Sequence, residues 1–278
     1  MKKKILAITN QKGGVAKSTT AAQVSSYIAS KGKRVLLIDL DPQGNASSKF
    51  LKMVSKFEDN GNAFGPPQHE DGAYYTSASL FKNPAETEWD AYPTATENLF
   101  VLPASSSMFE SQQRSDYAIK NFTDWMNYAE LWDHFDVLII DTPPAKNLFS
   151  EAAITAATHV IIPCPMEKSP FEGLMAAIQF INVVNAPFAT NDMAQIIGIL
   201  PTMFRGTQAL HKSFLARLKK MLGQLATPFE IKYRPTYQEM DMVAKTKPYI
   251  VPNNSKTKAA YEEWTMLGEF VMNKMEIM

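Results

Sequence analysis

Cysteine is nearly absent from the sequence, because Cys164 is the only one among 278 residues. A single cysteine excludes a cysteine-ligated iron–sulfur cluster, and its place in the apolar run 160–165 predicts a buried, unreactive thiol. The sequence also lacks an apolar run of the ~18 residues that a membrane-spanning helix needs. The first residues, Met-Lys-Lys-Lys, lead directly into an apolar strand, unlike a signal peptide. We therefore expect a soluble cytoplasmic protein.

The chain has no net charge, since 28 basic side chains balance 28 acidic ones, but the charges are unevenly distributed. Residues 1–56 carry 11 basic and 2 acidic side chains, whereas residues 57–200 carry 5 and 19. Residues 201–278 carry 12 and 7. A sequence with basic terminal segments and an acidic central segment permits one basic face on the folded protein. Segments of like charge are, however, commonly just solvated surface.

Residues 5–20 have the pattern of a polyphosphate-binding loop. The apolar run 5–8 predicts a strand buried on both faces, and it is followed by a glycine pair, then Lys17 and Ser18, then a helix-forming segment. Backbone N–H groups of such a turn and of the helix N-terminus bind anions. Lys17 adds a mobile positive charge, and Ser18 offers an oxygen to a magnesium ion.

The strict P-loop pattern G-x-x-x-x-G-K-[ST] does not fit this loop. When Lys17 is aligned with its lysine, Gln11 and Ala16 occupy the two glycine positions. The chain has K-G-G-x-x-K-S instead, with a second lysine, Lys12, just before the glycine pair. Taken alone, this segment also permits an ordinary glycine turn between a strand and a helix.

Two further apolar strands end in aspartates. Residues 34–40 run into the segment D-L-D-P-Q-G-N, which contains Asp39 and Asp41, and the run F-D-V-L-I-I-D-T-P-P ends a strand with Asp141. The carboxyl ends of parallel strands meet at one sheet edge, where open α/β sheets bind ligands. An aspartate at the position of Asp141 typically holds a metal-bound water rather than the magnesium ion itself. For the first segment, an ordinary Asp-Pro-x-Gly turn is the alternative.

Together, these three segments resemble the ParA family within the ParA/MinD superfamily of deviant Walker A ATPases. The resemblance implies ATP and Mg²⁺ as cofactors and slow, partner-stimulated hydrolysis of ATP to ADP and phosphate. The nucleotide-binding residues that it implies are Lys12, Gly13, Gly14, Val15, Ala16, Lys17, Ser18 and Thr19. The implied catalytic residues are Lys12, Lys17 and Asp41, and the implied metal site comprises Ser18, Asp41 and Asp141.

The resemblance gives two of these residues distinct roles. Asp41 would orient the attacking water, and Lys12 would reach the nucleotide of a second subunit. Two ATP-bound chains would then sandwich two ATP molecules as a homodimer. Lys146, shortly after the third segment, departs from the family pattern and is either a solvated loop lysine or a phosphate or partner contact.

Alternating strand and helix patterns predict a doubly wound, mostly parallel sheet flanked by helices, as in a P-loop NTPase, in a single domain spanning residues 1–278. Helices are expected at 19–31, 109–132 and 256–275, and strands at 34–40, 99–102, 135–141, 159–165 and 195–201. Residues 53–97 predict an irregular insertion with one short helix near 78–81 and a solvated His69.

Residues 201–258 hold 11 basic and 3 acidic side chains. An excess of basic side chains without a motif that reads bases is typical of proteins that contact nucleic-acid phosphates regardless of sequence. The alternative is that these side chains cover a solvated helix surface. The resemblance favours non-specific DNA binding. The candidate DNA contacts are Arg205, Lys232, Arg234, Lys245 and Lys247, of which Arg234 matches an arginine of the family.

The function implied is a switch in plasmid or chromosome partition. A nucleoid-associated ATP dimer in a bacterial or archaeal cytoplasm would release DNA when a ParB-like or other adaptor stimulates hydrolysis. A positioner of non-DNA cargo would share every motif, and an ATP-using synthetase would need a substrate pocket that no motif marks. A MinD-like membrane ATPase needs a basic amphipathic tail. The expected last helix and its end instead have Glu262, Glu263, Glu269 and Glu276 against Lys258 and Lys274, so no membrane contact is expected.

Overall fold

A computed structural model describes residues 3–58, 61–111, 115–166, 170–188, 193–235, 237 and 255–278. At its centre is a seven-stranded sheet with the order β5-β6-β2-β7-β1-β8-β9. The strands are β1 (Ile5–Ile8), β2 (Val35–Asp39), β5 (Tyr92–Pro93), β6 (Leu99–Leu102), β7 (Val137–Asp141), β8 (His159–Pro165) and β9 (Gln195–Thr202). Every neighbouring pair is parallel except β5 and β6, which are antiparallel.

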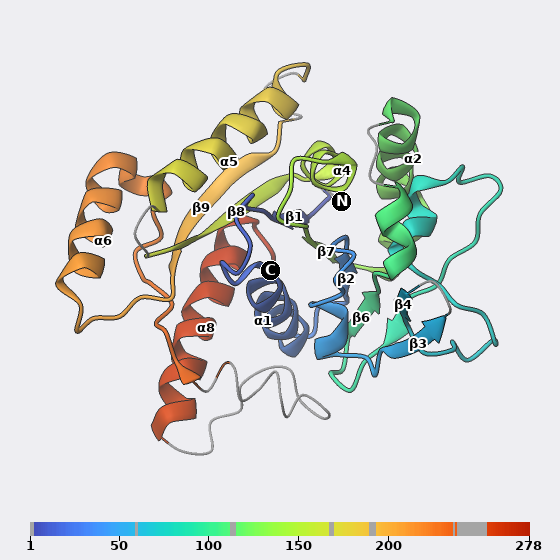
Figure 1. The fold of residues 1–278 in the computed structure, drawn as a ribbon, viewed down its shortest axis with the longest axis horizontal. Helices are drawn as coiled ribbons and strands as arrows, with labels where there is room; N and C mark the ends of the chain where they lie inside the picture. The colour runs from blue at the N-terminus through green and yellow to red at the C-terminus, as the bar shows by residue number, and fades with distance from the viewer. Residues whose placement is uncertain are drawn as a thin grey trace.

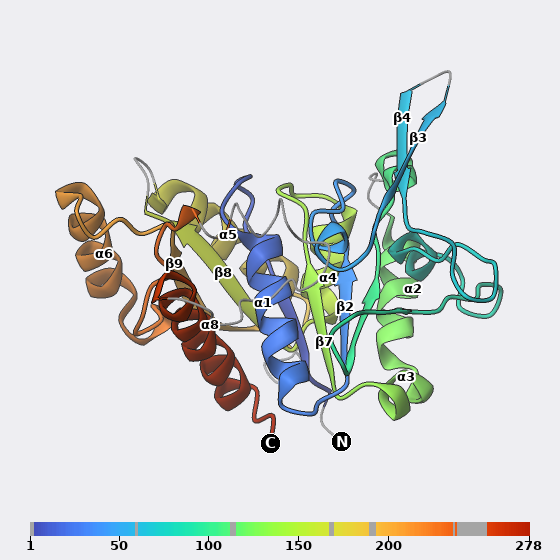
Figure 2. The same cartoon turned by 90° about the horizontal axis from the view of Figure 1, so that it is seen from below.

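Helices cover both faces of this sheet (Figures 1 and 2). The helices are α1 (Lys17–Ser30), α2 (Asp116–Asn127), α3 (Ala129–His134), α4 (Leu148–Ala156), α5 (Pro170–Asn185), α6 (Ala209–Leu222) and α8 (Ser255–Lys274). The 3-10 turns are η1 (Ser47–Lys49), η2 (Ser77–Phe81), η3 (Ser106–Ser111) and η4 (Gly223–Leu225). The predicted doubly wound, mostly parallel sheet is confirmed.

The apolar strands are buried on both faces, because alternate side chains enter two separate cores. In β1, Leu6 and Ile8 join the core beneath α1 and α8, while Ile5 and Ala7 join the core beneath α2, α4 and α5. This explains why the run has no alternation of apolar and polar residues. Because β1 lies between β7 and β8, the loop that follows it is held at the middle of the sheet edge.

The helix predicted at 109–132 is wrong as a single element. Residues up to 111 belong to η3, and α2 begins after Ser115, whose hydroxyl accepts the backbone N–H of Ala118 as a helix cap. Tyr128 is extended, with φ −61° and ψ 131°, and it separates α2 from α3. The indole of Trp132 donates to the carbonyl of Met126 across this break.

Residues 53–97 are more regular than the predicted irregular insertion. Strands β3 (Val54–Glu58) and β4 (Gly61–Gly65) form an antiparallel hairpin, and β5 adds an edge strand to the main sheet. The short helix expected near 78–81 is confirmed as η2. In Figure 2 the hairpin projects beyond the sheet edge at which the loop before α1 lies.

His69 is also not the solvated residue that the sequence predicts. Its side chain is 9% exposed and packs edge-on against the rings of Tyr75 and Tyr92. Its Nδ1 lies 3.3 Å from Asp71, and its Nε2 lies 3.6 Å from Asp90. The ring therefore helps to fix the loop between β4 and β5.

The last helix packs inside the fold, as predicted. Trp264, Leu267 and Val271 of α8 are buried in the same core as Val24 and Ile28 of α1. Across the part of the chain that the structure describes, helices are too short or too polar to cross a bilayer.

We predict that Gly268→Ala destabilises the fold. An Ala Cβ at Gly268 of α8 would lie 2.1 Å from Cδ1 of Tyr27, within the ring that α1 presents. Gly→Ala inside a helix normally stabilises by about 1 kcal/mol, but overpacking typically costs about 1–3 kcal/mol. We therefore expect a lower free energy of unfolding in urea denaturation.

A helical glycine with space around it provides the matched control. A Cβ at Gly173 of α5 would meet only Cβ of Lys12, at an ordinary 3.9 Å. Gly173→Ala should therefore stabilise the chain. A Gly268→Ala variant as stable as Gly173→Ala would contradict the close approach of α1 and α8.

Candidate nucleotide-binding site

The loop between β1 and α1 is held in place by side-chain hydrogen bonds to its neighbours. Asn10 Nδ2 donates to the carbonyl of Pro163 at 2.7 Å, and Asn10 Oδ1 accepts the N–H of Lys12 at 2.9 Å. Gln11 donates to the carbonyl of Ala176 in α5 at 3.0 Å. The polar residues after β1 therefore fasten the loop to β8 and α5.

Two residues of the loop have left-handed backbone conformations. Gly14 has φ +70°, and Ala16, the N-cap of α1, has φ 72° and ψ 27°. For a residue with a Cβ, this conformation costs about 1–2 kcal/mol. Ala16 occupies the second glycine position of the strict P-loop pattern, and its backbone has a conformation that glycine adopts without strain. Such strain is characteristic of ligand-binding loops.

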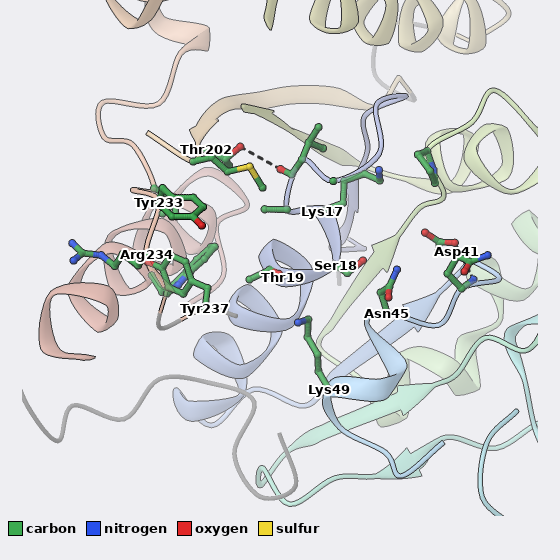
Figure 3. A pocket seen from close by; sticks show the side chains of 18 of the residues that line it. Lys17, Ser18, Thr19, Asp41, Asn45, Lys49, Thr202, Tyr233, Arg234 and Tyr237 are labelled. Atoms are coloured by element: carbon green, nitrogen blue, oxygen red, sulfur yellow. Dashed lines mark hydrogen bonds between the residues drawn. The ribbon is translucent and has the colours of Figure 1, made fainter. Parts of the chain in front are cut away.

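A cavity of about 450 Å³ opens beside this loop. The first turn of α1 and the segment around Asp41 form one side, and residues 231–234 with Tyr237 and Trp264 form the other (Figure 3). The residues of the predicted site that line it are Gly14, Val15, Ala16, Lys17, Ser18, Thr19 and Asp41. Of the remaining predicted residues, Lys12 and Gly13 are exposed and Asp141 is buried. Side chains from the β1–α1 loop, from the first turn of α1 and from the segment after β2 therefore meet at one cavity.

Lys17 is buried among carboxylates, with 6% of the residue exposed. Burial lowers its pKa, and the charges of Asp141 and Asp41 act in the opposite direction. Its Nζ donates to the carbonyl of Lys12 at 3.1 Å. The ammonium group of Lys17 therefore lies at the loop. An anionic ligand bound there would replace part of the hydration that the ammonium group loses through burial.

Three aspartates at the ends of β2 and β7 all have raised pKa values. Burial raises the pKa of Asp39 to about 6, opposed by the hydrogen bonds it accepts from the N–H and hydroxyl of Ser47. Burial and the nearby Asp39 raise the pKa of Asp141 well above its ordinary value. Burial also raises the pKa of Asp41, whose Oδ1 accepts the N–H of Gln43 at 3.0 Å. The charge of Lys17 opposes the rise at Asp41 and Asp141, so the three acidic groups outnumber the lysine that acts on them.

The donors at this edge fit a magnesium ion held together with phosphates. Both carboxylate oxygens of Asp141 are buried without a hydrogen-bond partner, although the nearby Ser18 hydroxyl favours the ionised form. Within the described ranges, no three His, Cys, Asp or Glu side chains form a complete metal cage. Mg²⁺ usually keeps several waters and takes one or two protein oxygens plus substrate phosphates, which matches Ser18 backed by Asp141.

The predicted DNA-contacting residues have differing surroundings. The Arg205 guanidinium stacks on the ring of Tyr233, 3.9 Å from its centroid. Arg234 forms an ion pair with the buried Glu263 at 2.5 Å, and Lys232 Nζ lies 3.9 Å from the same carboxylate. Lys232 and Arg234 also line the cavity. Lys245 and Lys247 lie outside the described residues.

Several cavity residues were not identified from the sequence. Lys49 of η1 is 9% exposed, and its side chain extends toward the start of α1 (Figure 3). The hydroxyl of Thr202, at the end of β9, donates to the carbonyl of Val15 at 3.2 Å and so fastens the loop to β9. Tyr237 and Trp264 come from distant segments that carry no motif. A signal existed for Lys49 alone, since it follows the D-P-Q-G-N segment closely.

The fold and this loop define a P-loop-type nucleotide-binding α/β protein. A family model described as an AAA domain matches residues 3–195. The chain is 32% identical to the sporulation initiation inhibitor protein Soj of Bacillus subtilis over 78% of this chain and 79% of that protein. It is 27% identical to the chromosome-partitioning ATPase Soj of Thermus thermophilus over 98% of this chain and 96% of that protein. The chain belongs to the ParA family of ATPases.

Solved structures share the fold at lower sequence identity. The apo form of McdA from Cyanothece has a TM-score of 0.71 at 21% identity, over 98% of this chain and 99% of that one. Cobyrinic acid a,c-diamide synthase from Mycobacterium smegmatis has a TM-score of 0.72 at 21% identity, over 99% of this chain and 96% of that one. One architecture therefore serves proteins with different names and tasks, so function must be argued from the site.

We predict that Arg234→Ala lowers the free energy of unfolding by about 2 kcal/mol. Removing one partner of a buried ion pair typically costs about 3–5 kcal/mol, and the partial exposure of Arg234 reduces this. Glu263 is 4% exposed and would lose its strongest donor. Glu263→Ala should cost less, because the freed arginine can reach water.

Urea denaturation measures these differences. Lys212→Ala, at an exposed lysine of α6, is the control and should change stability by at most about 0.5 kcal/mol. If Arg234→Ala were as stable as Lys212→Ala, the ion pair would contribute nothing to the fold.

Proposed function

We propose that this chain, as a single domain spanning residues 1–278, is an ATP-dependent switch that dimerises with ATP and Mg²⁺ and positions DNA cargo. The observation that carries the proposal is the contrast between the two lysines of the loop. Lys17 is buried at its own cavity, whereas Lys12 is exposed and does not line it. Because Lys12 is exposed outside that cavity, we propose that it reaches a nucleotide bound to a facing subunit.

Phosphoryl transfer to water asks the protein for positioning and charge compensation. The N–H groups of residues 14–19 and the Lys17 ammonium would hold the β- and γ-phosphates. Ser18 and Asp141 would hold Mg²⁺, which when bound neutralises charge on those phosphates. Asp41, fixed by the N–H of Gln43, would orient the attacking water. The raised pKa of Asp41 also makes its carboxylate a stronger proton acceptor than an exposed aspartate.

Lys12 would link the nucleotide state to dimerisation. If Lys12 contacts the phosphates of the facing subunit, ATP stabilises the dimer and the dimer raises the affinity for ATP by the same factor. Hydrolysis removes the contacted phosphate and so weakens the interface. The rate of hydrolysis, set by an adaptor protein, would then decide how long the dimer persists.

DNA binding would follow from doubling a weakly basic surface. The exposed face of α6 carries Lys212, Arg217, Lys219 and Lys220, and Arg205 lies just before this helix. Each contact with a DNA phosphate is weak, but two linked copies multiply their effect. Contacts by Arg205, Lys232, Arg234, Lys245 and Lys247 belong to the same proposal. A nucleoid-bound dimer in the cytoplasm would thus carry or space its cargo.

Lys12→Ala should abolish nucleotide-dependent dimers while leaving ATP binding by the monomer largely intact. The expected readout is a monomeric mass in light scattering with Mg²⁺ and a non-hydrolysable ATP analogue, under conditions in which the parent chain is dimeric. Lys82→Ala, at an exposed lysine of the insertion, is the control and should dimerise like the parent. If Lys12→Ala formed dimers over the same range of protein concentration as the parent, Lys12 would not contact the nucleotide of the facing subunit.

The DNA proposal is tested with random duplex DNA in filter binding. The parent and Asp41→Ala, which should trap the ATP dimer, are expected to bind with ATP and Mg²⁺ but not with ADP. Affinity should fall steeply with salt, with a log–log slope of about −0.9 per phosphate contacted. Arg205→Ala should weaken binding and reduce this slope, whereas Lys82→Ala should not.

Two other outcomes would redirect the proposal. ATP-dependent dimers that bind neither DNA nor liposomes would favour a non-DNA cargo. Liposome binding without DNA binding would overturn the DNA proposal and favour a membrane ATPase.

A further inference from the structure

The β3–β4 hairpin touches the segment that carries Asp41. Gly44, in residues 41–45, has φ +62°, and a Cβ there would lie 2.0 Å from Cζ of Phe64 and 2.6 Å from Cε1. The Phe64 ring thus occupies the place that any side chain at position 44 would fill. The D-P-Q-G-N turn needs its glycine for this close approach as well as for its backbone conformation.

Phe64 is fixed from behind by the body of the protein. Its backbone N–H donates to Ser106 Oγ at 3.0 Å, and the Ser106 hydroxyl lies 3.1 Å from the Phe64 carbonyl as a donor. Ser106 begins η3, which follows Ala104 and contains Met108, both fully buried. The last residues of β4 are therefore anchored, and the ring has a defined position over Gly44.

Gly44 is connected to the Asp41 carboxylate through a single turn. Its N–H donates to the carbonyl of Asp41 at 2.8 Å, and its own carbonyl accepts the N–H of Ser48 at 2.9 Å. Between them, Gln43 donates its N–H to Asp41 Oδ1. A shift of Gly44 away from the ring would therefore move the donor that orients Asp41.

We propose that Phe64 is a positioning residue for hydrolysis, through which the β3–β4 hairpin controls the placement of Asp41 in the cavity. The inference rests on the role proposed above for Asp41 and adds a regulatory input to that site. The hairpin projects beyond the sheet edge (Figure 2), and displacement of β4 would reach Asp41 through the Phe64 ring and Gly44. A misplacement of about 1 Å at a catalytic group can cost on the order of 100-fold in rate.

The test separates positioning from nucleotide binding. Phe64→Ala should lower the single-turnover rate of ATP hydrolysis about tenfold or more, while the affinity for a fluorescent ATP analogue stays within about twofold. Phe64→Leu, which keeps an apolar side chain over Gly44, should recover most of the rate and guards against simple misfolding. Tyr74→Ala removes a ring that is 57% exposed in the same insertion and should match the parent.

Amide hydrogen exchange of the nucleotide-free chain gives a second readout. In Phe64→Ala, the N–H groups of Gly44 and Ser48 should exchange faster than in the parent, and in Tyr74→Ala they should not. Unchanged turnover in Phe64→Ala would overturn the positioning role whether or not exchange is faster. Equal losses of nucleotide affinity and rate would also overturn it, because they indicate a general structural effect.

The two proposals fail in distinguishable ways. A parent chain that hydrolyses no ATP would overturn the proposed function, and with it the control of hydrolysis by Phe64. If the parent hydrolyses ATP and Phe64→Ala hydrolyses it at the same rate, only the inference about Phe64 is overturned.

Discussion

The structure depends on the burial of one lysine against an excess of carboxylates at the carboxyl edge of the sheet. Lys17 faces Asp41 and Asp141, and Asp39 lies next to both acids. Desolvation acts on each of these groups toward its neutral form. A divalent cation would compensate the charge of the buried aspartates, and a polyphosphate bound at the loop would compensate the charge of Lys17. The charged groups at this sheet edge are therefore arranged to bind a metal ion and a polyphosphate rather than to stabilise the fold.

Strain in the loop serves the same purpose. Ala16 keeps a left-handed conformation that costs free energy, and the surrounding hydrogen bonds of Asn10, Gln11 and Thr202 oppose its relaxation. The loop is thus fixed to β8, β9 and α5 by the protein's own hydrogen bonds. Because little of the loop must become ordered on binding, more of the binding free energy remains for affinity.

The sequence predicts those parts of the fold whose signals are local. Strands β1, β2 and β7 are continuous apolar runs followed by a phosphate-loop pattern or an aspartate, so the pattern predicts a parallel sheet with Lys17 and Asp41 at the same edge, but not the order of the strands. The β3–β4 hairpin has no such signal, since β4 contains two glycines and an asparagine and its strands are stabilised mainly by each other. The contact of Phe64 with Gly44 joins segments twenty positions apart through packing alone. The break at Tyr128 also has no glycine or proline to mark it in the sequence, and the hydrogen bond from Trp132 to the carbonyl of Met126 spans it.

The nucleotide cavity and the proposed DNA surface share one segment of chain. Residues 231–234 form a wall of the cavity, and they include Lys232 and Arg234, which the sequence marks for DNA. Both basic groups are directed at Glu263 of α8, so their charge is partly neutralised within the fold. A nucleotide that shifts this wall would change how much of that charge faces outward. If the chain binds DNA as proposed, the Arg234–Glu263 pair would give occupancy of the cavity a way to change the affinity for that polyanion without a large rearrangement.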